Sequence, residues 1–351
     1  MNATLQCLLH VNELSAYFLD EYPNDWINLK NKNKHVESQG NLSRQFYEIV
    51  KGVEDDSGYR GNSFNSPTTT VVPRKDTTKF FSNNRNAYSP DEFKRVLGYY
   101  NPQFRRFEAN DSKDFISYLL PTMHDELNYN GENYSLPIKD SPNQYDQLNA
   151  FTFFMDYYNT RNFSIISNIF YGTYENLTQC LECQKMKYDY QKFEFISFGM
   201  DDYKNKPFNI YDGFEDNQKI QFFRGDNKFY CHECKKLCET KICCRIIQPP
   251  NTLLINIYYG KNKKYQPSKI IFDEEIDITK YVSFNFGSNI RYKLICVCTY
   301  LGSSGSYGHY IAFCKHRYTG QWYYFNDSSC SKCSPEETRR GSPYLLFYEK
   351  I

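Results

Sequence analysis

The sequence lacks any run of about 18 apolar residues, the length that a membrane-spanning helix needs. Its first residues also lack the basic segment and the small-residue cleavage site of a secretory signal. These absences predict a cytoplasmic or nuclear protein that does not enter a membrane. In such a compartment the 13 cysteines of this 351-residue chain are expected to be reduced thiols and metal ligands, not a disulfide framework.

A strong net charge is also missing. Lysine plus arginine (42) nearly balances aspartate plus glutamate (41), which argues against nucleic acid or an anionic membrane as a partner. A protein partner remains open. Hydrophobic residues make up 40% of the chain and aromatic residues 18%, enough for a sizeable core in one large or two smaller domains.

Helical spacing dominates the first 155 residues. Ser89 is predicted to cap one helix, with Pro90 at its first position and Glu92 completing a capping box. The polar residues 54–86, punctuated by glycine and proline, predict a long surface loop or insertion. The expected helices cover residues 1–19, 42–53, 89–100 and 111–128.

From about residue 163 onward, the pattern changes to short β-branched or aromatic runs separated by Gly, Asn, Ser or Pro. These runs are expected to be strands, at residues 192–200, 251–260, 291–302, 308–317, 321–327 and 343–350. A helical first part followed by antiparallel strands predicts an α+β fold.

Two Cys-x-x-Cys pairs, about fifty residues apart, have the spacing of a zinc ribbon. The four residues are Cys180, Cys183, Cys231 and Cys234. Two such turns brought together provide the tetrahedral set of four thiolates that structural zinc prefers. The alternatives are unliganded reduced cysteines or a redox pair, and Cys238, Cys243 or Cys244 could replace a ligand. A zinc ribbon alone does not define an activity.

His309 follows a glycine-containing loop and begins an alternating strand, where Gly308 would allow a substrate chain to approach the imidazole. Asn326 and Asp327 end the next expected strand. If the two strands form a hairpin through residues 317–321, one of these side chains returns to His309 as the orienter of a Cys-His-Asn/Asp triad. The alternative is a histidine and an Asn-Asp turn at ordinary strand ends.

A nucleophile for this triad is not evident from the local pattern. Cys314 lies on the His309 strand and Cys330 just beyond Asn326, but neither is at a helix N-terminus, where a thiolate would be stabilised. Cys7 lies among the leucines of the opening helix and is expected to pack in the core.

These segments together resemble the ubiquitin-specific proteases, the papain-like cysteine peptidases that remove ubiquitin from proteins. MNATLQCLLHVNELSAYFL is similar to the continuation of the family's cysteine box, and Asn110-Asp111 occupy the place of its Gln-Asp pair. The remaining resemblance lies in NIFYGTYENLTQCLECQ, QPPNTLLINIYYG, YKLICVCTYLGSSGSYGHYIAFCK, WYYFNDSSCS and PYLLFYEK. Tyr258-Tyr259-Gly260 departs from the family's basic residue and Phe at that point.

The resemblance implies one catalytic domain over residues 1–351, with a helical thumb, a β palm and zinc-ribbon fingers. The thumb would be residues 1–155 with the insertion at 54–86. The fingers, interleaved with the palm, would span 163–260, and the palm with its histidine box 261–351. The same resemblance implies a monomer that binds ubiquitin and ubiquitinated proteins, with zinc on Cys180, Cys183, Cys231 and Cys234.

The resemblance also implies roles in catalysis: His309 would be the general base, Asn326 its orienter and Asp327 the adjacent acid. The family's nucleophilic cysteine would fall two residues before Met1. We therefore expect a deubiquitinase chain truncated just after its catalytic cysteine and inactive as written. The alternatives are a non-catalytic ubiquitin-binding module and a zinc-ribbon nucleic-acid binder, which the charge balance disfavours.

Overall fold

The computed structural model describes residues 1–55, 88–106, 110–131, 144–260, 267–284, 287–304 and 307–351. The predicted loop at 54–86 lies outside these residues except at its first two positions, which end a helix. Across the described residues, none of the helices combines the length and the apolar character that crossing a membrane requires.

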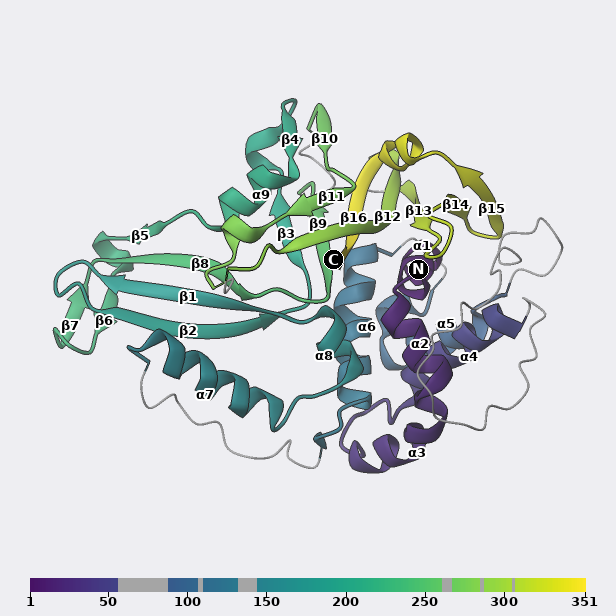
Figure 1. Ribbon diagram of the computed structural model, residues 1–351, viewed down its shortest axis with the longest axis horizontal. Helices are drawn as coiled ribbons and strands as arrows, with labels where there is room; N and C mark the ends of the chain where they lie inside the picture. Colours follow the sequence, from purple (N-terminus) through teal and green to yellow (C-terminus); the bar gives the residue numbers. More distant parts are fainter. Residues whose placement is uncertain (56–87, 107–109, 132–143, 261–266, 285–286, 305–306) are drawn as a thin grey trace.

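Helices form one end of the molecule, where α4 packs against α2, α5 and α6 (Figure 1). This end comprises α1 Asn2–Leu9, α2 Asn12–Asp20, α3 Tyr22–Lys32, α4 Asn41–Asp55, α5 Asp91–Tyr100 and α6 Ser112–Glu126. Helix α8 Ile165–Phe170 packs against α6 and α2 at this same end. Helices α7 Gln147–Asn159 and α9 Ile210–Asn217 lie elsewhere.

Two local predictions in this helical part are wrong. The opening helix is interrupted at His10 and Val11, where the Val11 N–H bonds to the Leu8 carbonyl and a new helix begins at Asn12. Ser89 does not cap α5, because its hydroxyl donates to the Asp91 carboxylate and Pro90 occupies the cap position.

Glu92 does not complete a capping box either, since its carboxylate pairs with Arg95 one turn later.

The central sheet has the strand order β15-β14-β13-β12-β16-β9-β3, with β11 paired to β12. Its strands are β3 Ile196–Gly199, β9 Thr252–Tyr258, β11 Glu275–Asp277, β12 Arg291–Ser304, β13 Tyr307–Lys315, β14 Trp322–Asn326, β15 Ser329–Cys333 and β16 Ser342–Lys350. All pairs are antiparallel except β3 with β9. The α+β prediction is therefore confirmed.

A second sheet, with the order β2-β1-β8-β5, extends away from the helices and ends in the β6–β7 hairpin (Figure 1). We call these six strands the fingers. They are β1 Gly172–Cys180, β2 Met186–Phe193, β5 Gln221–Phe223, β6 Phe229–Cys231, β7 Lys236–Cys238 and β8 Thr240–Gln248. A short parallel pair, β4 Pro207–Asn209 with β10 Lys269–Ile271, completes the strands described.

Helix α1 lies against the central sheet and contacts β12, β13 and β14. Its buried residues Leu5, Cys7 and Leu8 join one continuous hydrophobic core that links the helical end to the sheet. The expectation that Cys7 packs in the core agrees with its complete burial. This contact fixes where the first residues of α1 lie relative to the hairpin that carries His309.

His124 is buried on α6, where its Nδ1 lies 2.7 Å from the Ser164 hydroxyl, and burial lowers the pKa of His124 to about 4. The ordinary pKa is 6.5, so between these values the unfolded chain binds more protons than the folded one. The free energy of unfolding should then fall as the pH drops from about 6.5 to 4, by about 3 kcal/mol in total from this group.

His124→Gln should remove this part of the pH dependence, because glutamine does not titrate. Urea unfolding of both proteins at several pH values between 4 and 7 measures it, with His35→Gln on the exposed surface as the matched control. If the free energy of unfolding of His124→Gln fell with pH as steeply as that of wild type, His124 would not be the cause of the pH dependence.

Candidate active site and zinc site

The β13–β14 hairpin brings His309 and Asn326 together, as the sequence suggested. Ala312 pairs with Phe325 and Lys315 with Trp322 across the hairpin. His309 Nε2 lies 2.6 Å from Asn326 Oδ1, and the Asn326 amide nitrogen donates to the Tyr324 hydroxyl at 3.1 Å. Because that amide oxygen can only accept, Nε2 must carry the proton, which leaves Nδ1 of a neutral His309 free to act as a base.

Asp327 lies beside this pair and connects it to α1. One of its carboxylate oxygens is 3.7 Å from His309 Nε2, and the other accepts from the Asn2 side chain at 2.9 Å. Asp327 has a φ of +49°, the left-handed conformation that aspartate tolerates better than most residues. This backbone turn lets two successive side chains face the same imidazole.

His309 opens onto a hollow of about 310 Å³. The walls of this hollow come from the start of α1, the start of α5, the residue before the N-cap of α6, and strand β13. They are Met1, Asn2, Ala3, Ser89, Pro90, Asp91, Lys94, Asn110, Gly308, His309, Tyr310 and Asp327. The side chain of His309 is 45% exposed, so a substrate can reach it.

None of the cysteines, all of which are among the described residues, lines this hollow. Cys7 and Cys314 are completely buried, and burial raises the pKa of both thiols well above the ordinary value. Burial likewise raises the pKa of Cys330, to about 12. A reactive cysteine needs the opposite, an accessible and stabilised thiolate.

Gly308 packs against the ring of Tyr300 on the neighbouring strand, so a Cβ at this position would lie 2.0 Å from that ring. The glycine therefore keeps β12 and β13 in register beside His309. On the other wall, Asp111 caps α6 by accepting from the Lys113 N–H at 2.7 Å and accepts from the Tyr344 hydroxyl at 2.5 Å. These contacts tie α6 to the sheet next to Asn110.

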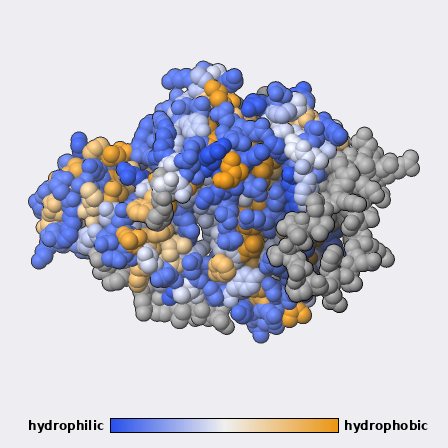
Figure 2. Space-filling view, in the orientation of Figure 1, coloured by the Kyte–Doolittle hydropathy of each residue, from blue (hydrophilic) through white to orange (hydrophobic). Residues whose placement is uncertain are grey.

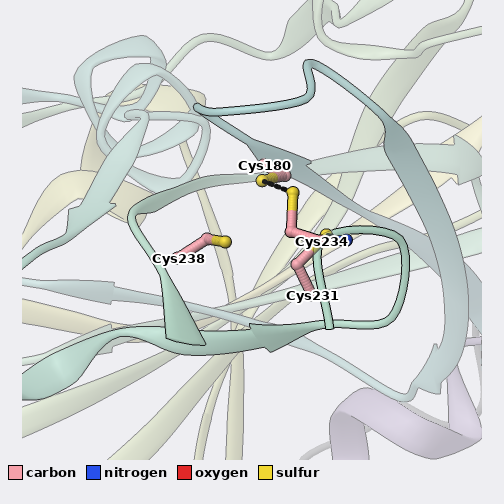
Figure 3. Close-up of side chains that lie close together, drawn as sticks. All are labelled: Cys180, Cys231, Cys234 and Cys238. Carbon is pink, nitrogen blue, oxygen red and sulfur yellow. Dashed lines mark hydrogen bonds between the residues drawn. The ribbon is translucent and has the colours of Figure 1, made fainter. Parts of the chain in front are cut away.

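A cluster of thiols lies at the end of the fingers, where the two predicted cysteine pairs meet. The sulfur atoms of Cys180, Cys231, Cys234 and Cys238 all lie within 4.8 Å of one another (Figure 3). Cys180 Sγ is 4.0 Å from Cys234 Sγ, and Cys183 Sγ is 3.7 Å from Cys231 Sγ. In a tetrahedral zinc site with Zn–S bonds of about 2.3 Å, neighbouring sulfurs are about 3.8 Å apart, so the spacing fits zinc.

Backbone N–H groups point at two of these thiols. Burial raises the pKa of Cys180, but the backbone N–H groups of Cys183 and Glu182, together with the neighbouring thiols of Cys183 and Cys231, outweigh it and lower this pKa to about 7. The Cys234 N–H points at Cys231 Sγ at 3.5 Å. N–H groups directed at sulfur stabilise the thiolate form that binds a metal.

Cys238 is the fifth thiol of this region. It ends β7 with its side chain completely buried, and burial raises its pKa to about 11, whereas Cys183 is exposed on the turn after β1. The sequence offered Cys238 as an alternative ligand, but its place in the quartet depends on the β6–β7 pairing, which spacing did not reveal. Asn2 and the part of the wall formed by residues 89–94 were also missed, because they lie more than 200 residues from the hairpin in the sequence.

The family model described as ubiquitin carboxyl-terminal hydrolase matches residues 1–348. The chain therefore belongs to the ubiquitin carboxyl-terminal hydrolase family.

Individual relatives support this assignment over the whole chain. Ubiquitin carboxyl-terminal hydrolase 4 of Vanderwaltozyma polyspora is 26% identical over 375 residues, which cover 100% of this chain and 40% of the relative. Ubiquitin carboxyl-terminal hydrolase 5 of Saccharomyces cerevisiae is 25% identical, with 100% and 43% covered. The human ubiquitin carboxyl-terminal hydrolase 2 is 24% identical, with 99% and 53% covered. The chain thus spans about half the length of the curated relatives it matches, or less.

Solved structures share the fold. The SAGA DUB module that contains Ubp8, bound to monoubiquitin, matches with a TM-score of 0.68 and 21% identity, covering 100% of this chain and 66% of that one. The same module bound to ubiquitin aldehyde matches with a TM-score of 0.67 and 20% identity, covering 100% and 67%. The fold is therefore that of a ubiquitin-specific protease, and the thiol cluster lies in its fingers.

Proposed function

We propose that this chain is the catalytic domain of a cysteine deubiquitinase, which hydrolyses the bond after the C-terminal glycine of ubiquitin. The observation that carries the proposal is the 2.6 Å contact between His309 Nε2 and Asn326 Oδ1 at the edge of an open hollow, in a chain of this family. Residues 1–351 would form one domain, with a thumb at 1–155, fingers interleaved with the palm over 163–260, and the remainder of the palm at 261–351.

In the proposed reaction, Nδ1 of His309 removes the proton of a cysteine thiol while Asn326 holds the ring by accepting from Nε2–H. The thiolate attacks the glycine carbonyl and forms a thioester, while the His309 imidazolium gives its proton to the departing amine. Water then attacks the thioester with neutral His309 again as base, and the proton that His309 takes from water returns to the cysteine sulfur as the ubiquitin carboxylate leaves. Asp327, whose second oxygen is held by Asn2, adds negative charge that stabilises the imidazolium formed at each step.

The nucleophile of this reaction would come from the segment that precedes Met1. Met1, Asn2 and Ala3 line the hollow together with His309, so a residue just before them would enter the same space. The family resemblance places the nucleophile two residues before Met1. We therefore propose that the 351-residue chain is inactive by itself and that the complete enzyme is active.

The zinc site would hold the fingers in shape for binding ubiquitin. Zinc would be held by four of the five clustered thiols, in the closed S₄ arrangement of a structural site. The related module is known in complexes with monoubiquitin and with ubiquitin aldehyde. We propose ubiquitin, alone or conjugated, as the partner of this chain.

A second candidate function is a non-catalytic ubiquitin-binding module, favoured by one observation: no cysteine lines the hollow. Such a protein would bind ubiquitin through the palm and fingers and compete with active enzymes.

Ubiquitin carrying a thiol-reactive group at its C-terminus tests both candidates. It should label a chain that includes the upstream residues and leave residues 1–351 unlabelled, although both bind unmodified ubiquitin. Labelling of residues 1–351 would mean that one of the 13 cysteines is the nucleophile. Binding of ubiquitin without labelling of the longer chain would favour the non-catalytic module.

A further inference from the structure

A second group of thiols lies in the core between α1 and the central sheet. The sulfur atoms of Cys7, Cys296 and Cys314 lie within 4.8 Å of one another, and all three side chains are completely buried. Cys7 belongs to α1, Cys296 to β12 and Cys314 to β13. This group is remote from the fingers and does not line the hollow at His309.

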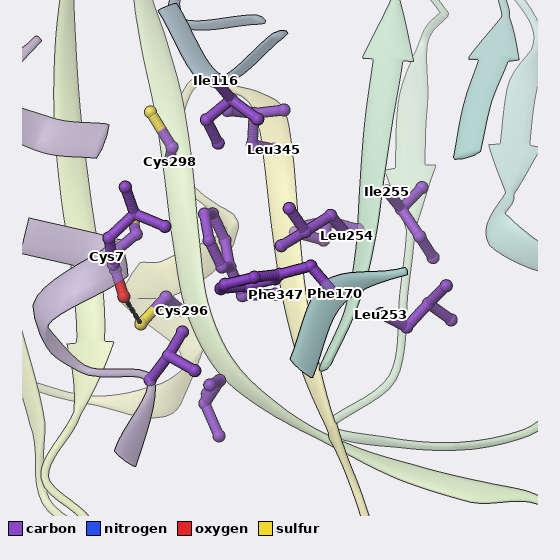
Figure 4. Close-up of a cluster of buried hydrophobic side chains, with 14 of the residues drawn as sticks. Cys7, Ile116, Phe170, Leu253, Leu254, Ile255, Cys296, Cys298, Leu345 and Phe347 are labelled. Atoms are coloured by element: carbon purple, nitrogen blue, oxygen red, sulfur yellow. Dashed lines mark hydrogen bonds between the residues drawn. The ribbon is translucent and has the colours of Figure 1, made fainter. Parts of the chain in front are cut away.

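The three sulfurs converge because of strand register and helix position. Cys296 and Cys314 are direct partners across β12 and β13, so their side chains project from the same face of the sheet. Helix α1 lies on that face, and Cys296 Sγ donates to the Cys7 carbonyl at 3.7 Å (Figure 4). Cys298, the next residue on this face of β12, bonds instead to the Ser112 hydroxyl at 3.8 Å and stays outside the cluster.

We propose that Cys7, Cys296 and Cys314 form a binding site for one trivalent thiophilic ion of the arsenic(III) class, which joins α1 to β12 and β13. The proposal does not depend on the deubiquitinase activity. Three sulfurs bound to one arsenic(III) form a trigonal pyramid, because a lone pair occupies the fourth position, and the sulfurs then lie in close contact with one another. The three sulfurs here already lie within 4.8 Å of one another.

The charge of the site selects the class of ion. The cluster is surrounded by the hydrophobic core. The charges that act on each thiol come from the other thiols of the cluster and, for Cys296, from Glu349. A divalent ion on three thiolates would leave one negative charge buried there, at high cost. A trivalent ion on three thiolates is neutral and suits an apolar surrounding. Soft thiolates also favour soft ions over hard ones.

The binding reaction balances without an oxidant or a reductant. Arsenous acid, As(OH)₃, reacts with three thiols to give As(SCys)₃ and three waters. Each S–H bond is replaced by an S–As bond, and each hydroxyl leaves with a thiol proton. Arsenic remains in the trivalent state. Entry requires α1 to separate briefly from the sheet, because the thiols are completely buried, so we expect slow binding.

The experiment adds inorganic arsenite to the zinc-loaded chain and measures bound arsenic and zinc per chain by native mass spectrometry. Wild type is expected to take up one arsenic and keep its zinc. Cys7→Ala and Cys314→Ala should lose the arsenic, whereas Cys298→Ala, the matched buried control on β12, should keep it. The proposal is overturned if wild type takes up none, if both cluster variants keep it, or if arsenic enters only as zinc leaves.

A measurement on wild type alone guards against misfolded variants. X-ray absorption at the arsenic edge should show three As–S contacts and no As–O contact while zinc is retained. Thermal unfolding should shift upward by several degrees with arsenite, because a ligand that binds only the folded state stabilises it. Fewer than three sulfur neighbours would rule out this trithiol site.

Discussion

His309→Ala, made in a chain that includes the proposed upstream cysteine, should lower kcat/KM for a ubiquitin substrate by on the order of 10⁴ to 10⁶-fold. The thiol loses the group that removes its proton, and the departing amine loses its proton donor. His309 is 45% exposed and makes its polar contacts within the hairpin, so its removal should leave stability nearly unchanged. Steady-state cleavage and thermal unfolding measure the two effects.

Asn326→Ala should cost less than His309→Ala, on the order of 10²-fold or more, because the base remains and loses only the acceptor that holds its ring. Asn326→Asp keeps an acceptor at the same atom and should restore most of the activity. His35→Ala, at an exposed histidine in the helical part, is the matched control and should have no effect. If His309→Ala retained more than about a tenth of wild-type turnover, the proposed base would be wrong.

The sequence contains enough information to predict this hairpin because its contacts are local. His309 and Asn326 are 17 residues apart, and a short loop can connect two alternating strands in few ways. The contact of Asn2 with Asp327 spans 325 residues and follows only from the docking of α1 against the sheet. Docking depends on side-chain packing over the whole core, which local patterns do not encode.

The two short helices of the strand-rich part, α8 and α9, were also not predicted from the sequence. Helix α8 is capped by Ser164 with Ser167 and α9 by Asn209 with Asp212, so each begins with reciprocal capping bonds. These pairs differ from the usual Ser/Thr with Glu/Gln signature. Both helices are short, with six and eight residues, so their apolar periodicity was too brief to stand out.

Removing zinc should unfold the fingers, and this is the largest stability effect that we predict. Several large side chains there are exposed, Phe222 and Tyr230 at 54% and Leu237 at 60%, and hydrophobic residues appear on this end of the surface in Figure 2. Little apolar burial is left to hold β5–β7 together. Structural zinc binds zinc-finger peptides with about 10 to 16 kcal/mol at pH 7, comparable to the whole stability of a typical domain.

Hydrogen exchange before and after treatment with a chelator measures this effect. Protection should be lost in β5–β8 and kept in β12, β13 and β16, which lie in the apolar core. Elemental analysis should find one zinc per chain before chelation. Unchanged protection of the fingers in a metal-free chain would show that side-chain packing, not metal, holds them.

Single cysteine variants then identify the ligands among the five thiols. Cys231→Ala and Cys234→Ala should each abolish stoichiometric zinc, because both sulfurs belong to the quartet in the structure and to the set implied by the sequence. Cys183 belongs only to the set implied by the sequence, and Cys238 belongs only to the quartet in the structure. Cys183→Ala and Cys238→Ala therefore show which of these two thiols is the fourth ligand.

Cys244→Ala, a half-buried cysteine of β8 outside the cluster, is the matched control and should keep its zinc. Zinc retained by Cys183→Ala and lost by Cys238→Ala would make the buried β7 thiol the fourth ligand. The reverse result would mean that the exposed turn after β1 closes over the metal when it binds, bringing Cys183 into the site in place of Cys238.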